Sequence, residues 1–180
     1  VLKLPFLVGM VGYPESLTDP SYAGQILILT YPLIGSYGVP ARPSPTDTSL
    51  PANFESSKIH VAGLIVGSYS GANKDFSNYL AESDLADWLK EEGIPAIYGV
   101  DTRDLTKKLR EGGSTVGRLV RRAETNGAPH STAEATWRKS YETIEYHDSN
   151  RDDLVASVSR KDTKLYLPVG DVKPLLHPSG

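Results

Sequence analysis

The sequence predicts a single mixed α/β domain that is rich in β-strand. Three short apolar segments bounded by turn signals have the composition of buried strands, at residues 26–31, 59–69 and 94–100. Two further segments, at residues 82–93 and 101–113, repeat apolar residues at helical spacing. The chain has 180 residues, of which 39% are apolar and 23% charged, as is typical of a soluble domain with a buried core.

The strands are predicted from residue type and from the turn signals around them. Residues 26–31, ILILTY, are rich in β-branched side chains. Residues 59–69, IHVAGLIVGSY, suit a central strand covered on both faces. Residues 94–100, IPAIYGV, predict a third strand, and residues 114–120, STVGRLV, a fourth. The opening residues, VLKLPFLVGMVG, favour a buried strand over a signal peptide, because they lack an initiator Met and a clear cleavage site.

Capping residues mark the ends of two predicted helices. In ESDLADWLKEEG, Ser83 is the predicted N-cap and Gly93 the residue that follows the helix. Asp101 caps the second helix, which stops at Gly112 or Gly113. The side chains expected to face the core are Leu85, Trp88 and Leu89 in the first helix and Leu105 and Leu109 in the second.

A third, shorter helix is predicted within residues 149–159. Ser149 precedes it as a cap. Leu154, Val155 and Val158 are expected to face inward.

Other segments have the composition of loops and connectors. Residues 33–57 contain four prolines and many Ser and Thr, which predicts a long surface loop. Residues 121–147 are polar without a sustained period and predict an insertion or a linker. Residues 163–170, TKLYLPVG, predict a last strand or an exit segment, and the tail at 171–180 is typical of an interdomain connector.

Charge, composition and motifs exclude several classes of function. The net charge of −3 gives no overall attraction to nucleic acid or to an anionic membrane. No apolar run approaches the roughly 20 residues of a membrane span. Because the chain has no cysteine, disulfides, thiolate metal sites and a cysteine nucleophile are excluded. The motifs GxxxxGKS/T, GxGxxG and GxSxG are missing. A Ser/His/Asp triad stays open, since its members need only meet in space. The histidines lack zinc-ligand spacing; they are His60, His130, His147 and His177.

The loop at residues 12–25, GYPESLTDPSYAGQ, is unusually polar for a segment that leads into a buried strand. Asp19 and Pro20 form a strong turn signal, because the Asp side chain bonds the backbone two residues on and proline fixes the next φ. Such a turn could aim Ser21 and Tyr22 outward as hydrogen-bond donors. The residues leave two alternatives: a turn that satisfies its own backbone, or a loop that presents groups to a ligand or a neighbouring domain.

Cations gather on and after the second predicted helix. Arg103 lies in its first turn, where the helix dipole disfavours a cation, so it either pairs with Glu15 or Asp19 or is solvated. Residues 107–122 contain six cations and a single acidic residue, Glu111. These cations form either a solvated face or a contact for an acidic partner or a phosphate. No aromatics are interleaved, which disfavours a nucleic-acid platform. The cluster consists of Lys107, Lys108, Arg110, Arg118, Arg121 and Arg122.

Long blocks of the sequence resemble a known family. The blocks are GMVGYPESLTDPSYAGQILILTYPLIGSYGVP at 9–40, HVAGLIV at 60–66 and WLKEEGIPAIYGVDTRDLTKKLREGGSTVGRL at 88–119. They resemble the N-terminal domain of the small, glutamine-using chain of carbamoyl-phosphate synthase, in its eukaryotic form. HDSNRDDLVASVS at 147–159 is similar to the family's closing segment, with Ser149 where proline is usual.

The resemblance implies a swivelling β/β/α fold and a non-catalytic part in making carbamoyl phosphate, in the cytoplasm, for pyrimidine or arginine synthesis. In that family, a following class I amidotransferase domain hydrolyses L-glutamine, and ammonia passes to a large chain that uses ATP and Mg. No cofactor, metal, nucleic acid or membrane is therefore expected at this segment. The family contacts glutamine through the serine of DPSY, which is Ser21 here. The candidates for partner contact are Arg103, Lys107, Lys108 and Arg110.

The resemblance also divides the chain. Residues 1–120 are the domain core, 121–147 the insertion or linker, 148–170 the closing segment, and 171–180 a linker toward an amidotransferase domain. The family's usual β-hairpin region before the first block is not matched, so we expect an incomplete sheet with an exposed edge. The isolated chain is expected to hydrolyse no glutamine.

Two other functions stay open. One is a freestanding scaffold or binding module that kept the fold without the enzyme. The other is anion or nucleic-acid binding by residues 107–122, which predicts binding that weakens steeply with salt.

Overall fold

The structure, a computed structural model, describes residues 2–3, 6–7, 12–44, 51–70, 76, 78–113, 115–120 and 152–163. Its strands are β1 (Leu2–Lys3), β2 (Phe6–Leu7), β3 (Ile26–Leu29), β4 (Val39–Pro40), β5 (Gly63–Val66), β6 (Ala81–Ser83), β7 (Ala96–Ile97) and β8 (Val116–Gly117). Its helices are α1 (Tyr13–Thr18), the 3-10 helix η1 (Pro20–Tyr22), α2 (Leu85–Glu91), α3 (Thr102–Gly112) and α5 (Leu154–Val158). The mixed α/β class is confirmed, although most strands are short; the swivelling arrangement stays a prediction.

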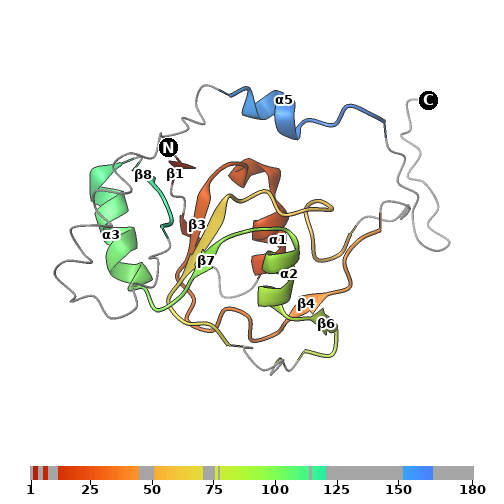
Figure 1. The fold of residues 1–180 in the computed structure, drawn as a ribbon, viewed down its shortest axis with the longest axis horizontal. Helices are drawn as coiled ribbons and strands as arrows, with labels where there is room; N and C mark the ends of the chain where they lie inside the picture. Colours follow the sequence, from red (N-terminus) through yellow and green to blue (C-terminus); the bar gives the residue numbers. More distant parts are fainter. Residues whose placement is uncertain are drawn as a thin grey trace, which may run out of the picture.

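A parallel four-stranded sheet forms the centre of the molecule (Figure 1). Its strand order is β2-β3-β5-β7, and Ile26 of β3 lies opposite Gly63 of β5. All four residues of β3 and all four of β5 are buried. The prediction of a central strand within residues 59–69 is therefore confirmed.

Side chains of the two central strands alternate between two hydrophobic clusters, because successive strand residues point to opposite faces. Leu27 and Leu29 of β3 share one cluster with the apolar residues of α1 and α2. Ile26 and Ile28 share the other with Leu109 of α3. Figure 1 shows the result, with α1 and α2 on one side of the sheet and α3 on the other. Every apolar position of these strands is thus covered.

The helices bury the faces that their periodicity predicts. Leu85, Trp88 and Leu89 of α2 are buried. Leu109 of α3 is buried, and Leu105 is half-buried against the same cluster. The helical spacing of these residues was therefore a sound guide to packing.

Three of the predicted helix ends are confirmed. The Asp101 carboxylate accepts a hydrogen bond from the Asp104 amide at 2.9 Å and so caps α3. That helix ends at Gly112. Gly93 follows the C-cap residue Glu92 of α2 with a φ of 70°, a conformation that glycine adopts without strain.

The predicted N-cap of α2 was wrong by one residue. Ser83 is the last residue of β6 and pairs with Val39 of β4. The cap is Asp84, whose carboxylate accepts a hydrogen bond from the Ala86 amide at 2.6 Å and another from the Tyr69 hydroxyl. The strand pairing of Ser83 therefore moves the start of the helix.

The prediction of a surface loop at residues 33–57 was also wrong in part. β4 pairs antiparallel with β6, and Ile34 forms a β-bridge with Tyr69. Ile34, Val39 and Phe54 are buried. The Phe54 ring meets the Trp88 ring edge-on, with 5.7 Å between their centroids. Prolines concealed this segment, because a short edge strand such as β4 tolerates them.

The ends of the described chain lie outside the central layers. β8 forms within the predicted fourth strand, but it pairs antiparallel with β1 in a separate two-stranded sheet. β2 and β7 are the edge strands of the central sheet within the described residues, and Ala96 and Ile97 of β7 are exposed. β7 is thus an exposed edge strand, at the edge of the central sheet opposite to β2.

α5 has no buried residue. Val155 is 75% exposed, so its predicted inward orientation was wrong. Asp153 caps this helix, by accepting a hydrogen bond from the Ala156 amide. Ser149, the insertion at 121–147 and residues 164–180 lie outside the described residues. Within the described part, no helix combines the length and the apolar character that crossing a bilayer requires.

The cap of α2 gives a first prediction. Replacing Asp84 with alanine (Asp84→Ala) removes the acceptor for the Ala86 amide and the Tyr69 hydroxyl, so the free energy of unfolding should fall by about 2 kcal/mol. The matched change Ser83→Ala should cost less than about 0.5 kcal/mol, because Ser83 caps nothing. Urea denaturation of both variants measures the difference, and equal losses would contradict the assignment of the cap.

Gly35 gives a second prediction. Its φ is 94°, and an added Cβ would lie 2.2 Å from the Ser70 carbonyl oxygen and 2.6 Å from the Tyr69 ring. Gly35→Ala should therefore lower the free energy of unfolding by about 3–5 kcal/mol. Gly93→Ala is the control: its φ is 70°, but nothing lies within 4 Å of the added Cβ, so its loss should be about 1–2 kcal/mol. A Gly35 variant no less stable than the Gly93 variant would refute the close approach.

Candidate functional site

The polar loop before β3 folds into a tight turn around Ser21. α1 ends at Thr18, and η1 begins at Pro20. Between them, the Asp19 carboxylate accepts a hydrogen bond from the Ser21 amide at 2.8 Å. The Ser21 carbonyl accepts another from the Gln25 side chain at 2.9 Å. The predicted turn signal of Asp19 and Pro20 is confirmed, and both backbone groups of Ser21 are satisfied locally.

The hydroxyl of Ser21 differs from its backbone groups in its hydrogen bonding. The residue is exposed, and its hydroxyl has no hydrogen-bond partner within the described residues. Tyr22, which was also expected to point outward, is half-buried and packs against the larger hydrophobic cluster. The turn thus satisfies its own backbone, as the first alternative from the sequence predicted, and leaves one hydroxyl exposed. Presentation of that hydroxyl to a ligand or a neighbouring domain stays a prediction.

The turn lies at the amino end of the sheet. Gln25 connects it directly to Ile26, the first residue of β3. The Ala62 amide, just before β5, donates a hydrogen bond to the Gln25 carbonyl at 2.8 Å. The Ser21 turn is therefore tied to the two central strands rather than to a peripheral loop.

Helix α3 carries the other predicted site residues. Arg103, Lys107, Lys108 and Arg110 are all exposed. Lys108 forms an ion pair with Asp104 at 2.7 Å. This pair lowers the pKa of the Asp104 carboxyl and raises the pKa of the Lys108 ammonium, in each case chiefly through their hydrogen bond. The positive charge of Lys108 is therefore balanced within the helix by Asp104.

The structure separates the alternatives that the sequence left open for Arg103. Within the described residues, Arg103 forms no ion pair with Glu15 or Asp19 and is exposed, in agreement with the solvated alternative. Arg118 is half-buried, so it does not extend the exposed face of α3. Arg121 and Arg122 lie outside the described residues.

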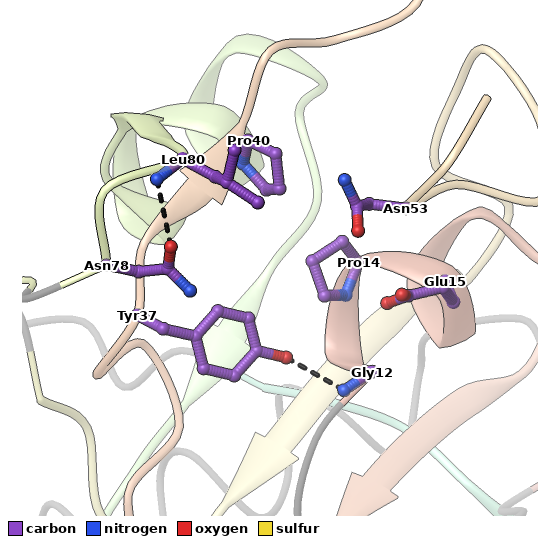
Figure 2. A pocket seen from close by; sticks show the side chains of 8 residues that line it. All are labelled: Gly12, Pro14, Glu15, Tyr37, Pro40, Asn53, Asn78 and Leu80. Carbon is purple, nitrogen blue, oxygen red and sulfur yellow. Dashed lines mark hydrogen bonds between the residues drawn. The ribbon is translucent and has the colours of Figure 1, made fainter.

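A small cavity lies beside the start of α1 (Figure 2). Its volume is about 220 Å³. The hydroxyl oxygen of Tyr37 accepts hydrogen bonds from the Gly12 amide at 2.8 Å and the Tyr13 amide at 3.1 Å. Tyr37 therefore caps a helix whose N-cap residue, Gly12, has no side chain to do so. The lining residues are Gly12, Pro14, Glu15, Tyr37, Pro40, Asn53, Asn78 and Leu80.

The two tyrosines at this helix start support each other. Their rings stack with 4.2 Å between centroids, and the Tyr13 hydroxyl donates to the Gly38 carbonyl. Burial raises the pKa of both tyrosines. Both hydroxyls therefore stay protonated and serve as structural donors and acceptors. Sequence reasoning missed Tyr37, because its partners lie more than twenty residues away.

A second, apolar cavity of about 240 Å³ lies beside the edge strand β7. Its lining includes the exposed residues Ile97 and Tyr98 and the buried residues Leu64 and Val66 of the sheet. None of its lining residues is charged, so the cavity is an apolar surface.

The Ser21 turn offers a group for recognition. Among the described residues, no group of three or more His, Asp or Glu residues is placed to hold a metal ion. The whole chain lacks cysteine. The turn presents an exposed hydroxyl on a locally satisfied backbone, and a hydroxyl can donate a hydrogen bond to a ligand or accept one from it.

Comparison with known proteins gives the family. The family described as "Carbamoyl-phosphate synthase small chain, CPSase domain" matches residues 3–119. The chain is 53% identical to multifunctional protein pyr-3 of Neurospora crassa over 182 aligned residues, which cover 99% of this chain and 10% of the relative. It is 50% identical to the carbamoyl phosphate synthase arginine-specific small chain of Saccharomyces cerevisiae over 115 residues, covering 64% of this chain and 27% of the relative.

A human protein is also similar. The mitochondrial carbamoyl-phosphate synthase (ammonia) is 41% identical over 164 residues, covering 91% of this chain and 10% of the relative. The chain thus spans about a tenth of the length of the longer relatives that it matches. The long blocks that carried the resemblance lie mostly inside the matched region. The chain belongs to the carbamoyl-phosphate synthase small-chain family and corresponds to its CPSase domain.

Proposed function

We propose that this chain is the non-catalytic N-terminal domain of a glutamine-using carbamoyl-phosphate synthase. In this proposal, Ser21 completes a glutamine site whose remaining parts belong to a class I amidotransferase domain. The single observation that carries the proposal is the exposed Ser21 hydroxyl on a turn whose backbone is otherwise satisfied. A polar group held in this way loses little conformational entropy when it meets a ligand.

The partners follow from the same proposal. The amidotransferase domain supplies the cysteine that this chain lacks, and a large chain or domain supplies the ATP and Mg sites. The length of the multifunctional relatives supports partners within one polypeptide. The exposed cations of α3, Arg103, Lys107, Lys108 and Arg110, are proposed to contact one of these partners.

The share of this chain that aligns with each relative favours one of the two pathways, pyrimidine or arginine synthesis. The arginine-specific small chain aligns with 64% of this chain, whereas the multifunctional protein of Neurospora crassa aligns with 99%. The alignment with the Neurospora crassa protein also covers residues beyond 119, which the family match does not reach. We therefore propose that the chain is part of a multifunctional polypeptide of the pyrimidine pathway. We also propose that it acts in the cytoplasm.

The proposal predicts a selective effect of Ser21→Ala in the full-length synthase. Loss of one hydrogen bond to glutamine should raise the KM for glutamine about two- to tenfold. Synthesis driven by added ammonia should not change, because ammonia bypasses the glutamine site. Steady-state assays with each nitrogen donor measure both values.

A serine elsewhere on the surface provides the control. Ser68, which follows β5, is also exposed, and its hydroxyl has no partner within the described residues. Ser68→Ala should leave both activities unchanged. If Ser21→Ala lowers glutamine- and ammonia-driven synthesis equally, the role of Ser21 is structural and the proposal fails.

The cationic face of α3 predicts a second effect. Lys107→Glu reverses an exposed charge and should lower glutamine-driven synthesis about two- to fivefold, the range expected for loss of an exposed ion pair. Added salt should narrow the difference from the wild type, because it screens exposed charges. Lys161→Glu makes the same charge change after α5 and serves as the control. Equal effects of the two variants would exclude α3 as the contact.

A further inference from the structure

A segment from far along the chain holds both ends of the Ser21 turn. It comprises residues 54–61, here called the strap. The His60 amide donates a hydrogen bond to the Leu17 carbonyl at 2.9 Å, just before the turn. The Gly24 amide, just after the turn, donates to the His60 carbonyl at 3.2 Å. One residue of the strap therefore fixes the distance between the two ends of the turn.

Two side chains add a second connection. The Ser56 hydroxyl donates to the Thr18 carbonyl at 2.7 Å, and the Nε2 atom of His60 lies 3.1 Å from the Ser56 oxygen. The Lys58 carbonyl is a second acceptor for this hydroxyl at 3.1 Å, but the Thr18 carbonyl is nearer and takes its single proton. This geometry favours the tautomer in which Nε2 of His60 carries a hydrogen and donates it to Ser56. Thr18 precedes Asp19, whose carboxylate holds the Ser21 amide. A continuous chain of hydrogen bonds and one peptide link thus joins His60 to Ser21.

The strap is itself firmly anchored. Phe54 and Ile59 are each 6% exposed, and Val61 is 2% exposed. The Glu55 amide donates to the Thr18 hydroxyl oxygen at 3.0 Å. Because the apolar anchors lie on either side of Ser56, the strap forms a rigid support for the turn.

The state of the His60 ring fits this arrangement. Burial lowers the pKa of His60, and the nearby Lys58 acts in the same direction, while the Asp19 carboxylate opposes them. The neutral ring with its hydrogen on Nε2 is therefore favoured near neutral pH. In that form it makes the bond to Ser56 without placing a second charge beside Lys58.

We propose that Ser56 and His60 are positioning residues that fix the direction of the Ser21 hydroxyl toward glutamine held by a neighbouring domain. This inference rests on the proposed function and deepens it. Neither residue touches glutamine; both act through Thr18 and Asp19. The strap sets the geometry of the turn before glutamine arrives, so less order has to be created on binding.

Kinetics of the full-length synthase test the inference. Ser56→Ala removes the bond to the Thr18 carbonyl and should raise the KM for glutamine about twofold or more, but no further than Ser21→Ala does, with ammonia-driven synthesis unchanged. The double variant Ser21→Ala, Ser56→Ala should be no worse than Ser21→Ala alone, because no hydroxyl remains to be positioned. Additive effects would overturn the positioning role.

Conservative variants separate positioning from general damage. His60→Gln keeps an N–H donor at the end of the side chain and should retain a KM near that of the wild type. His60→Leu lacks the donor and should resemble Ser56→Ala. Ser16 provides the matched control, since its hydroxyl donates to the Gly12 carbonyl at 2.8 Å at the other end of α1. Ser16→Ala should leave the KM for glutamine unchanged.

Amide hydrogen exchange in the same full-length protein, without glutamine, gives an independent measurement. Ser56→Ala and His60→Leu should speed exchange severalfold at residues 21–24, whereas His60→Gln should keep the slow rate of the wild type. If Ser21→Ala leaves the KM for glutamine unchanged, the proposed function fails, and exchange still shows whether the strap holds the turn. If Ser21→Ala raises the KM but Ser56→Ala does not, the positioning role alone is overturned. Unchanged exchange in Ser56→Ala would overturn it as well.

Discussion

Burial of β3 and β5 on both faces is the constraint on which the rest of the structure depends. Four consecutive apolar residues in each strand have to be covered from two sides. α1 and α2 cover one side and α3 covers the other. Parallel strands also need a connection that returns over a face of the sheet. α1 lies in the connection from β2 to β3 and α2 in the connection from β5 to β7, whereas the strap lies in the connection from β3 to β5. The turn and the strap owe their positions to these same connections.

The sequence predicted those parts of the fold that are set by local periodicity. The apolar runs gave β3 and β5, and helical spacing gave the buried faces of α2 and α3. Asp101 was found because a cap acts within three residues of itself. The strap, in contrast, was divided between two predictions: residues 54–57 were expected to be loop and residues 59–61 to begin a strand. Its apolar anchors are separated by polar residues without a period, so no local pattern marked it as one unit.

The misses have a common physical cause, which is pairing over long sequence distances. By residue type, Ser83 is as good an N-cap as Asp84. Ser83 pairs with Val39 as part of β6, however, so Asp84 caps the helix. Tyr37 caps α1 from a distance of about two dozen residues, which no local signal reveals. For the site, local chemistry predicted the bond from Asp19 to the Ser21 amide. The role of Ser21 toward glutamine came from resemblance to a family, since an exposed serine alone specifies no ligand.

The place of the Ser21 turn has a consequence for how the domain evolves. Open α/β sheets commonly bind their ligands at the carboxyl ends of the strands. Ser21 lies at the opposite ends of the strands, before the amino end of β3. Sequence changes in the loops at the carboxyl ends, such as the loop that leads from β7 to α3, therefore leave the position of the serine unchanged. Descendants of one ancestral domain can acquire new neighbours or new regulation at the carboxyl ends while the serine keeps its inherited position.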